Sequence, residues 1–146
     1  GRNAPGNFAR LVRLAGSGMP LPFAGIHNRR SLVGIDNLCD FLITTAHHPA
    51  AANETFLVSD AKDISTEDLV TTLRHGMGLA PRLFPFPHKA MQTILTGAGR
   101  GRMARQLYGD LQVSHRKAHA RLGWRPPYDT IESLMAAVNR DHGRLS

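Results

Sequence analysis

Short runs of apolar residues at helical spacing, each closed by glycine or proline, limit what this chain can fold into. Phe8, Leu11 and Leu14 form the first run, and Gly16, Gly18 and Pro20 follow it. Apolar residues that recur every three or four positions predict an amphipathic helix, and glycine or proline predicts its end. On this basis we expect helices over residues 7–15, 38–46, 66–77, 87–95, 115–122 and 130–138.

Brief strands are expected between these helices. Residues 21–23 are broken by Pro22 and suit only an edge strand, whereas residues 30–35, 55–58, 83–86 and 111–113 are short apolar or alternating segments. Asp36, Ser65 and Ser114 stand where helix caps belong. The sequence therefore predicts a mixed α/β fold, mostly helical with short strands, in which residues 1–146 form one lobe.

Size and composition agree with a folded domain. A chain of 146 residues buries roughly 70% of the surface that it exposes when unfolded. The lone Cys39 forms no internal disulfide, which indicates a reducing, cytoplasmic compartment. No apolar run approaches the roughly 20 residues that cross a bilayer, so we expect no membrane partner. Because the sequence starts at Gly1 without methionine, we expect a processed chain or a piece of a longer protein.

The basic charge leaves two interpretations open. The formal net charge is +7, which favours an anionic partner. The arginines are scattered and few aromatic residues stand among them, so base stacking is not indicated and no nucleic acid is expected. A basic α/β module that binds a nucleotide or nucleic acid without catalysis remains the alternative of a different class.

Other candidate groups have ordinary structural interpretations. His115 and His119 would share a helix face, as a zinc pair requires, but no third ligand is marked, so we expect no metal. Cys39 follows Leu38 on the apolar side of its helix, which predicts a small buried hydrophobic residue. Residues 97–102 (GAGRGR) match no phosphate-loop fingerprint and are interpreted as a mobile connection whose arginines could close over a phosphate.

Residues 28–37 (NRRSLVGIDN) carry the most information. An arginine held at the start of a strand presents a planar fork that suits bidentate phosphate recognition. A cap at Asp36 would fix the turn from strand to helix that holds Arg30 in place. On the pattern alone, an exposed arginine before an edge strand explains the same residues.

This stretch resembles the Arg-Asp-Phe-x-x-Val-Asp-Asp segment of extended short-chain dehydrogenases/reductases, the nucleotide-sugar epimerase/dehydratase family. Three further features agree with that resemblance and cover most of the chain. They are residues 5–8 (PGNF) with 21–25 (LPFAG), residues 55–60 (TFLVSD) with 64–69 (ISTEDL), and residues 114–118 (SHRKA) with 122–126 (LGWRP). They match only the C-terminal, substrate-binding part of such enzymes.

The resemblance implies a site without catalytic residues. The chain lacks the family's Tyr-x-x-x-Lys pair. Four positions after its two tyrosines, Tyr108 and Tyr128, stand Gln112 and Glu132 instead of lysine. The N-terminal Rossmann domain, absent here, would bind NAD or NADP, and this chain alone is expected to bind neither and to be inactive. The implied substrate contacts are Asn7 and Arg30 at the diphosphate, Leu21 and Phe23 beside uracil, and Arg102 or Arg105 at a second phosphate position.

The implied parent activity is that of an NAD(P)-dependent UDP-sugar epimerase of bacterial polysaccharide or O-antigen synthesis. The same lobe in a UDP-4-keto-sugar reductase is the alternative within the family, and a homodimer is possible. Residues 107–113 (LYGDLQV) point to this branch. Ser31 and Gly34 replace the acid and the aromatic residue usual in the family motif, so the motif does not define the sugar.

Overall fold

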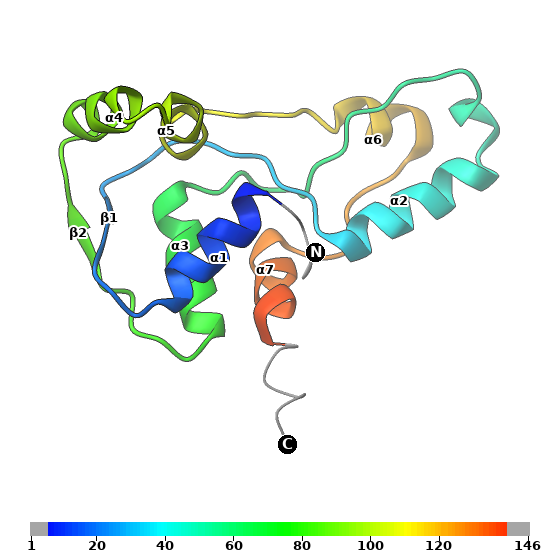
Figure 1. The fold of residues 1–146 in the computed structure, drawn as a ribbon. Helices are drawn as coiled ribbons and strands as arrows, with labels where there is room; N and C mark the ends of the chain where they lie inside the picture. Colours follow the sequence, from blue (N-terminus) through cyan, green and yellow to red (C-terminus); the bar gives the residue numbers. More distant parts are fainter. Residues whose placement is uncertain (1–5, 140–146) are drawn as a thin grey trace.

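The computed structural model describes residues 6–139, apart from the side chains of residues 88, 102–104, 106 and 139. About half of the chain is helical, and a small parallel pair of strands completes it, which confirms the predicted mixed α/β class. The elements, shown in Figure 1, are α1 (Asn7–Gly16), β1 (Leu21–Ala24), α2 (Ile35–His47), the 3-10 turn η1 (Pro49–Ala51), α3 (Thr66–Gly76), β2 (Leu83–Pro85), α4 (His88–Gly97), α5 (Gly101–Tyr108), α6 (Arg116–Leu122) and α7 (Thr130–Asn139).

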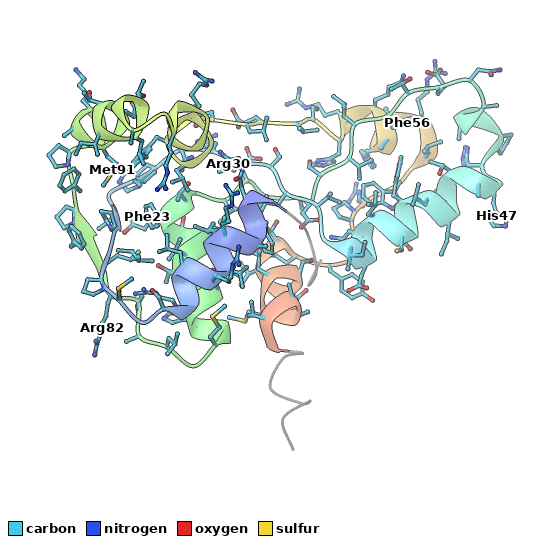
Figure 2. All side chains as sticks on the ribbon, viewed as in Figure 1. Phe23, Arg30, His47, Phe56, Arg82 and Met91 are labelled. Atoms are coloured by element: carbon cyan, nitrogen blue, oxygen red, sulfur yellow. The ribbon has the colours of Figure 1, made fainter. Side chains whose placement is uncertain are left out.

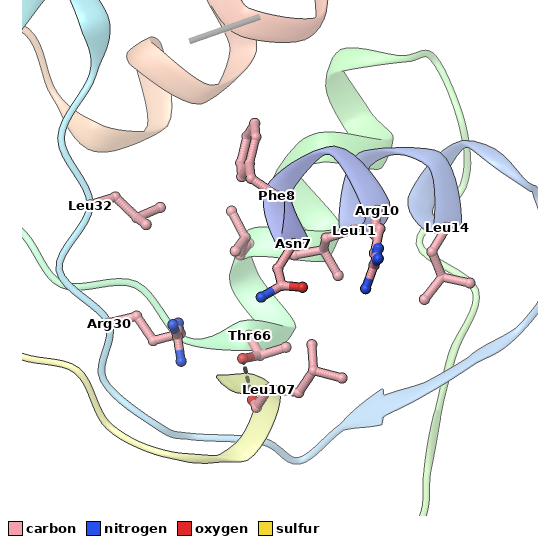
Figure 3. A pocket seen from close by; sticks show the side chains of 10 residues that line it. Asn7, Phe8, Arg10, Leu11, Leu14, Arg30, Leu32, Thr66 and Leu107 are labelled. Carbon is pink, nitrogen blue, oxygen red and sulfur yellow. Dashed lines mark hydrogen bonds between the residues drawn. The ribbon is translucent and has the colours of Figure 1, made fainter. Parts of the chain in front are cut away.

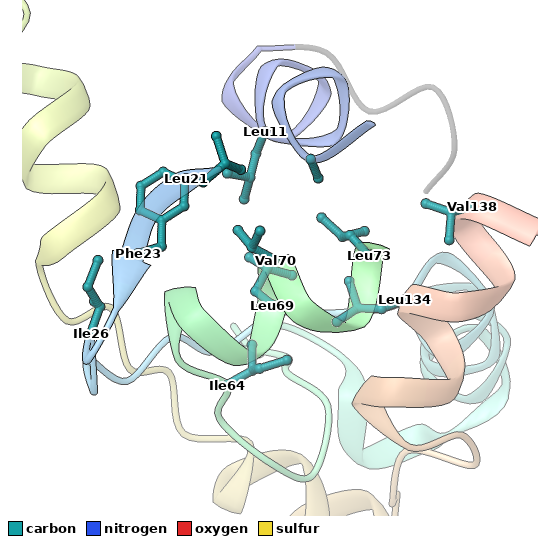
Figure 4. Close-up of a cluster of buried hydrophobic side chains, with 11 residues drawn as sticks. Leu11, Leu21, Phe23, Ile26, Ile64, Leu69, Val70, Leu73, Leu134 and Val138 are labelled. Carbon is teal, nitrogen blue, oxygen red and sulfur yellow. The ribbon is translucent and has the colours of Figure 1, made fainter. Parts of the chain in front are cut away.

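Two groups of elements lie apart along the molecule. Helices α1, α3 and α7 pack together with β1 and β2, while α2, η1 and α6 form a second group at the other end (Figure 1). Each group has its own buried cluster. The first core consists of Leu11, Ala15, Leu21, Phe23, Ile26, Ile64, Leu69, Val70, Leu73, Leu134 and Val138 (Figure 4), and the second core consists of Phe41, Ala118, Leu122 and Trp124.

Three extended segments connect the two groups at what we call the central junction, formed by residues 29–34, 59–64 and 110–113. Arg30 pairs with Ile64 in antiparallel fashion and with Leu111 in parallel fashion, and each pairing is an isolated bridge. The amide of Ser31 donates to the carbonyl oxygen of Leu111 at 2.7 Å, and that of Asp60 donates to Leu32 at 2.8 Å. The backbone of the segment that carries Arg30 is therefore held on both sides.

The prediction of strands at 30–35, 55–58 and 111–113 is wrong. The first and third form only the single bridges at Arg30 and Leu111, and α2 already begins at Ile35. Residues 55–58 are irregular, and in the described part of the chain no backbone ladder holds them. An apolar segment becomes a strand only where a neighbouring segment supplies hydrogen-bond partners. The predicted strands at 21–23 and 83–86 do form, as β1 and β2, and they pair with each other in parallel.

The observed helix starts agree only in part with the predicted capping residues. Ser65 caps α3, since its hydroxyl accepts from the amide of Asp68 at 3.0 Å, as predicted. The expected cap at Asp36 is wrong: Gly34 is the N-cap of α2, and Asp36 lies in the first turn. Asp60 replaces the missing cap side chain by accepting from the Gly34 amide at 3.0 Å and from Asn37 Nδ2 at 2.7 Å.

A buried arginine ties the first group together. Arg74 is fully buried near the end of α3, and its guanidinium donates to the carbonyl oxygens of Ala15, Met19 and Arg82. Burial lowers the pKa of Arg74, yet a guanidinium stays charged in proteins. These three acceptors lie at the end of α1 and just before β1 and β2, so Arg74 fixes the positions of three connections at once.

Candidate functional site

A pocket of about 260 Å³ lies at the N-terminal half of α1 (Figure 3). Its walls come from α1, from the central junction, from α3 and from α5. Most of the lining is apolar, and the polar side chains are few. The lining residues are Asn7, Phe8, Arg10, Leu11, Leu14, Arg30, Leu32, Thr66, Leu69 and Leu107.

Arg30 reaches this pocket from the central junction. Its amide donates to Ile64 O at 3.0 Å, its carbonyl accepts from Ile64 N at 2.9 Å, and Nη1 donates to Gly109 O at 3.1 Å. Burial lowers the pKa of Arg30, and the nearby carboxylate of Asp110 acts in the opposite direction. The guanidinium is therefore a fixed, half-buried cation at the edge of an apolar pocket (Figure 3).

Neighbouring Arg29 lies in a different environment. Its side chain is exposed, and its backbone amide donates to Asp110 Oδ1 at 2.7 Å. Extended backbone turns successive side chains to opposite sides. Arg29 is absent from the pocket lining that includes Arg30, so the two arginines form a natural pair for comparison.

Asn28 holds the pocket wall together. Its Nδ2 donates to Leu107 O at 3.2 Å and to Gly109 O at 3.0 Å, while its Oδ1 accepts from the amide of Thr66 at 2.8 Å. The hydroxyl of Thr66 donates to the same Leu107 carbonyl at 2.6 Å. These bonds attach the end of α5 to the start of α3. The sequence reasoning assigned no role to Asn28 or Thr66, because their partners lie up to 81 residues away.

The start of α1 adds a second positive feature. Gly6 is the N-cap, with φ of 82°, and the first turn contains no acidic side chain. The first amides of a helix are unpaired within it and carry the positive end of the helix dipole, which favours an anion. A helix start, a fixed guanidinium and apolar walls together suit a ligand that carries phosphate beside an apolar ring.

The predicted substrate residues do not all meet in this pocket. Asn7 and Arg30 both line it. Leu21 and Phe23 are only 3% and 4% exposed, and their side chains pack in the first core rather than in the pocket lining. Arg105 is exposed on α5, and the side chain of Arg102 lies outside the described residues. Position 107 of α5 lines the pocket instead, through a leucine that the sequence did not single out.

Three other expectations, for Cys39, for the histidine pair and for the connection at 97–102, can be compared with the structure. Cys39 is exposed, so the prediction of a buried residue is wrong; Phe41, two positions on, takes the buried place on α2. His115 contacts Ser59 Oγ through Nδ1 at 3.2 Å, and among the described residues no group of three potential metal ligands occurs. The predicted connection 97–102 is shorter than expected, because α5 already begins at Gly101.

The helices are also short. Within the part of the chain that the structure describes, none is long and apolar enough to span a bilayer.

Comparison with known proteins agrees with the resemblance seen in the motifs. The chain is 37% identical over 148 aligned residues to the UDP-glucose 4-epimerase of Vibrio cholerae, and the alignment includes 96% of this chain. The resemblance to a nucleotide-sugar epimerase is thereby confirmed. The chain spans 45% of the length of that relative. No protein-family model and no solved structure matches the chain.

Proposed function

We propose that this chain is a nucleotide-sugar-binding lobe, formed by residues 1–146, of an NAD-dependent sugar epimerase. The observation that carries the proposal is the pocket, where the Arg30 guanidinium and the start of α1 face an apolar wall. The similarity to a UDP-glucose 4-epimerase supports the same ligand class. The chemistry of a diphosphate joined to a uracil ring fits this combination of charge and apolar surface.

Each candidate residue has a proposed role. Arg30 forms charge-assisted hydrogen bonds with the diphosphate, and Asn7 contacts it at the helix start. Arg102 or Arg105 approaches a second phosphate position from α5. Because the side chains of Leu21 and Phe23 pack inside the first core, β1 would contact the base through its backbone.

The finer assignment follows the relative. In the whole enzyme, bound NAD would supply hydride exchange at the sugar, and a tyrosine would serve as general acid and base. Both would be supplied by a Rossmann domain. Within this proposal the product serves bacterial polysaccharide synthesis, and the enzyme acts in the cytoplasm. A keto-sugar reductase would use the same pocket, and no observation favours it.

The test compares Arg30 with Arg29 by calorimetric titration of the chain with UDP-glucose. Arg30→Ala removes a contact of about 1.5 to 3 kcal/mol, so the dissociation constant should rise roughly ten- to a hundredfold. Arg30→Lys should recover only part of this loss, because an ammonium group cannot replace the planar fork. Arg29→Ala changes the net charge equally and should have little effect.

Equal weakening in the Arg29 and Arg30 alanine variants would overturn the assignment of Arg30. Binding of a single-stranded oligonucleotide with steep salt dependence, without binding of UDP-glucose, would favour the nucleic-acid module instead.

A further inference from the structure

Helices α4 and α5 project at one end of the molecule as a pair that we call the basic hairpin, residues 88–108 (Figure 1). Helix α4 packs chiefly against α5, and none of its described side chains is buried. Met91 of α4 and Arg82 before β2 lie at the same end of the molecule, opposite the end where α2 carries His47 (Figure 2). Among the described lining residues of the pocket, Leu107 alone comes from this pair, and the proposed function adds only Arg102 or Arg105 of α5, so helix α4 has no role in it.

Charge is distributed unevenly around the hairpin. Residues 69–109 contain no aspartate or glutamate. Apart from the buried Arg74, this stretch carries five cationic residues, of which Lys89, Arg100 and Arg105 lie exposed on or between the two helices. All the charged side chains that this stretch places on the surface are therefore cationic.

Helix α4 is amphipathic as well. Its apolar residues Met91, Ile94 and Leu95 share one side, whereas Lys89 and Thr93 lie on the other. Met91 and Leu95 are half-buried, but Ile94 is 57% exposed. The helix therefore presents an apolar edge beside lysine and arginine side chains.

We propose that the basic hairpin docks on an anionic membrane surface. Helix α4 carries the exposed Ile94 on its apolar side and Lys89 on its polar side, and Arg100 and Arg105 lie beside it; cations next to an apolar side are the features of a helix that lies in the interface of a bilayer. Nucleic acid fits less well, because α4 offers no aromatic side chain for base stacking and Tyr108 of α5 packs against the first core. The expectation of no membrane partner depended on the absence of a spanning segment, which a surface helix does not need.

Flotation of the full chain with lipid vesicles tests this proposal. Vesicles of phosphatidylcholine with one third phosphatidylglycerol should carry the protein, and vesicles of phosphatidylcholine alone should not. Each lysine or arginine near an anionic surface strengthens binding about fivefold, so Lys89→Gln with Arg100→Gln should weaken partitioning by about 25-fold. Ile94→Glu should weaken it further by removing the apolar contact.

Ile43→Glu is the matched control, since Ile43 is 64% exposed on α2, outside the hairpin. It should partition like the unmodified chain, and circular dichroism should show that all variants fold. Equal loss in Ile43→Glu and Ile94→Glu, or equal binding to both vesicle types, would overturn the proposal. Absence of vesicle binding together with tight binding of duplex DNA would overturn it in favour of a nucleic-acid surface.

Discussion

The first core gathers mainly aliphatic side chains from three helices and β1, whereas two of the four residues of the second core are aromatic and their rings pack edge to face. The ring centroids of Phe41 and Trp124 lie 5.0 Å apart, and the ring of Phe56, which packs against this core, lies 5.9 Å from that of Phe41. The indole of Trp124 also donates to Asp40 Oδ2 at 2.7 Å. The first core is thus stabilised by contact among many elements, and the second by a few directional contacts around one helix.

This difference locates the candidate site. Leu11 and Leu69 belong to both the first core and the pocket lining, while no residue of the second core lines the pocket. Damage to the first core should therefore alter the pocket, and damage to the second core should leave it unchanged. Two substitutions test this division and a third tests the central junction between the two groups, in order of expected effect.

Leu73→Ala should have the largest effect. Leu73 is fully buried in α3, and removal of a leucine side chain from a packed core costs about 2 to 5 kcal/mol. Urea denaturation should show this loss in the free energy of unfolding, and amide exchange in both α1 and α3 should accelerate. A loss below about 1 kcal/mol would mean that the first core is not packed as described.

Trp124→Phe should have an intermediate effect. The change removes the hydrogen bond to the exposed Asp40 carboxylate and some aromatic contact, which we expect to cost about 1 to 2 kcal/mol. Hydrogen exchange should accelerate in α2 and α6, while amides of α3 keep their protection. Equal acceleration in all helices would show that the two cores unfold as one unit and would break the comparison.

Asp63→Asn should have the smallest effect, at the central junction. Asp63 accepts from Ser31 Oγ and Gln112 Nε2, both at 2.6 Å, and these hydrogen bonds lower its pKa. A lowered carboxyl pKa gives stability that is present above the unfolded pKa of about 3.9 and is lost as pH falls through the folded value. Since Asp63 is exposed, solvent screening limits this contribution to about 0.5 kcal/mol.

Melting temperatures at pH 7 and pH 3 provide the measurement for Asp63. The difference between the two temperatures should be smaller in Asp63→Asn than in the unmodified chain. If the difference between the two melting temperatures is unchanged in Asp63→Asn, this carboxylate does not contribute to the pH dependence of stability.

Local chemistry explains which parts of the fold were predictable. Ser65 and the apolar spacing of α3 specify that helix, and Gly123, with φ of 65°, ends α6 in a conformation that glycine adopts easily. Helix α5 was not predicted, because it is only eight residues long and follows a glycine-rich stretch. The strand at 55–58 was predicted wrongly, since periodicity gives no sign of whether a hydrogen-bonding neighbour is present.

The candidate site was predictable only where a residue acts through its own chemistry. Arg30 follows from residue type and position, Asn7 was assigned through the family resemblance, and both line the pocket. Asn28 and Thr66 act through bonds to the distant carbonyl of Leu107, which no local pattern encodes. Gly34 has a similar explanation: a Cβ there would lie 2.5 Å from Ser133 Oγ, so close packing against α7 disfavours the aromatic residue usual in the family motif.

The central junction also has a kinetic consequence. Arg29 and Asp110 are 81 residues apart, and Asp63 is 49 residues from Gln112 and 32 from Ser31. Closing such long loops costs chain entropy before any bond at the junction forms, and contacts of this kind slow folding. Helices such as α3 gain their hydrogen bonds locally and can form earlier. Because Arg30 reaches the pocket from the junction, we expect the binding surface to be completed at a late stage of folding.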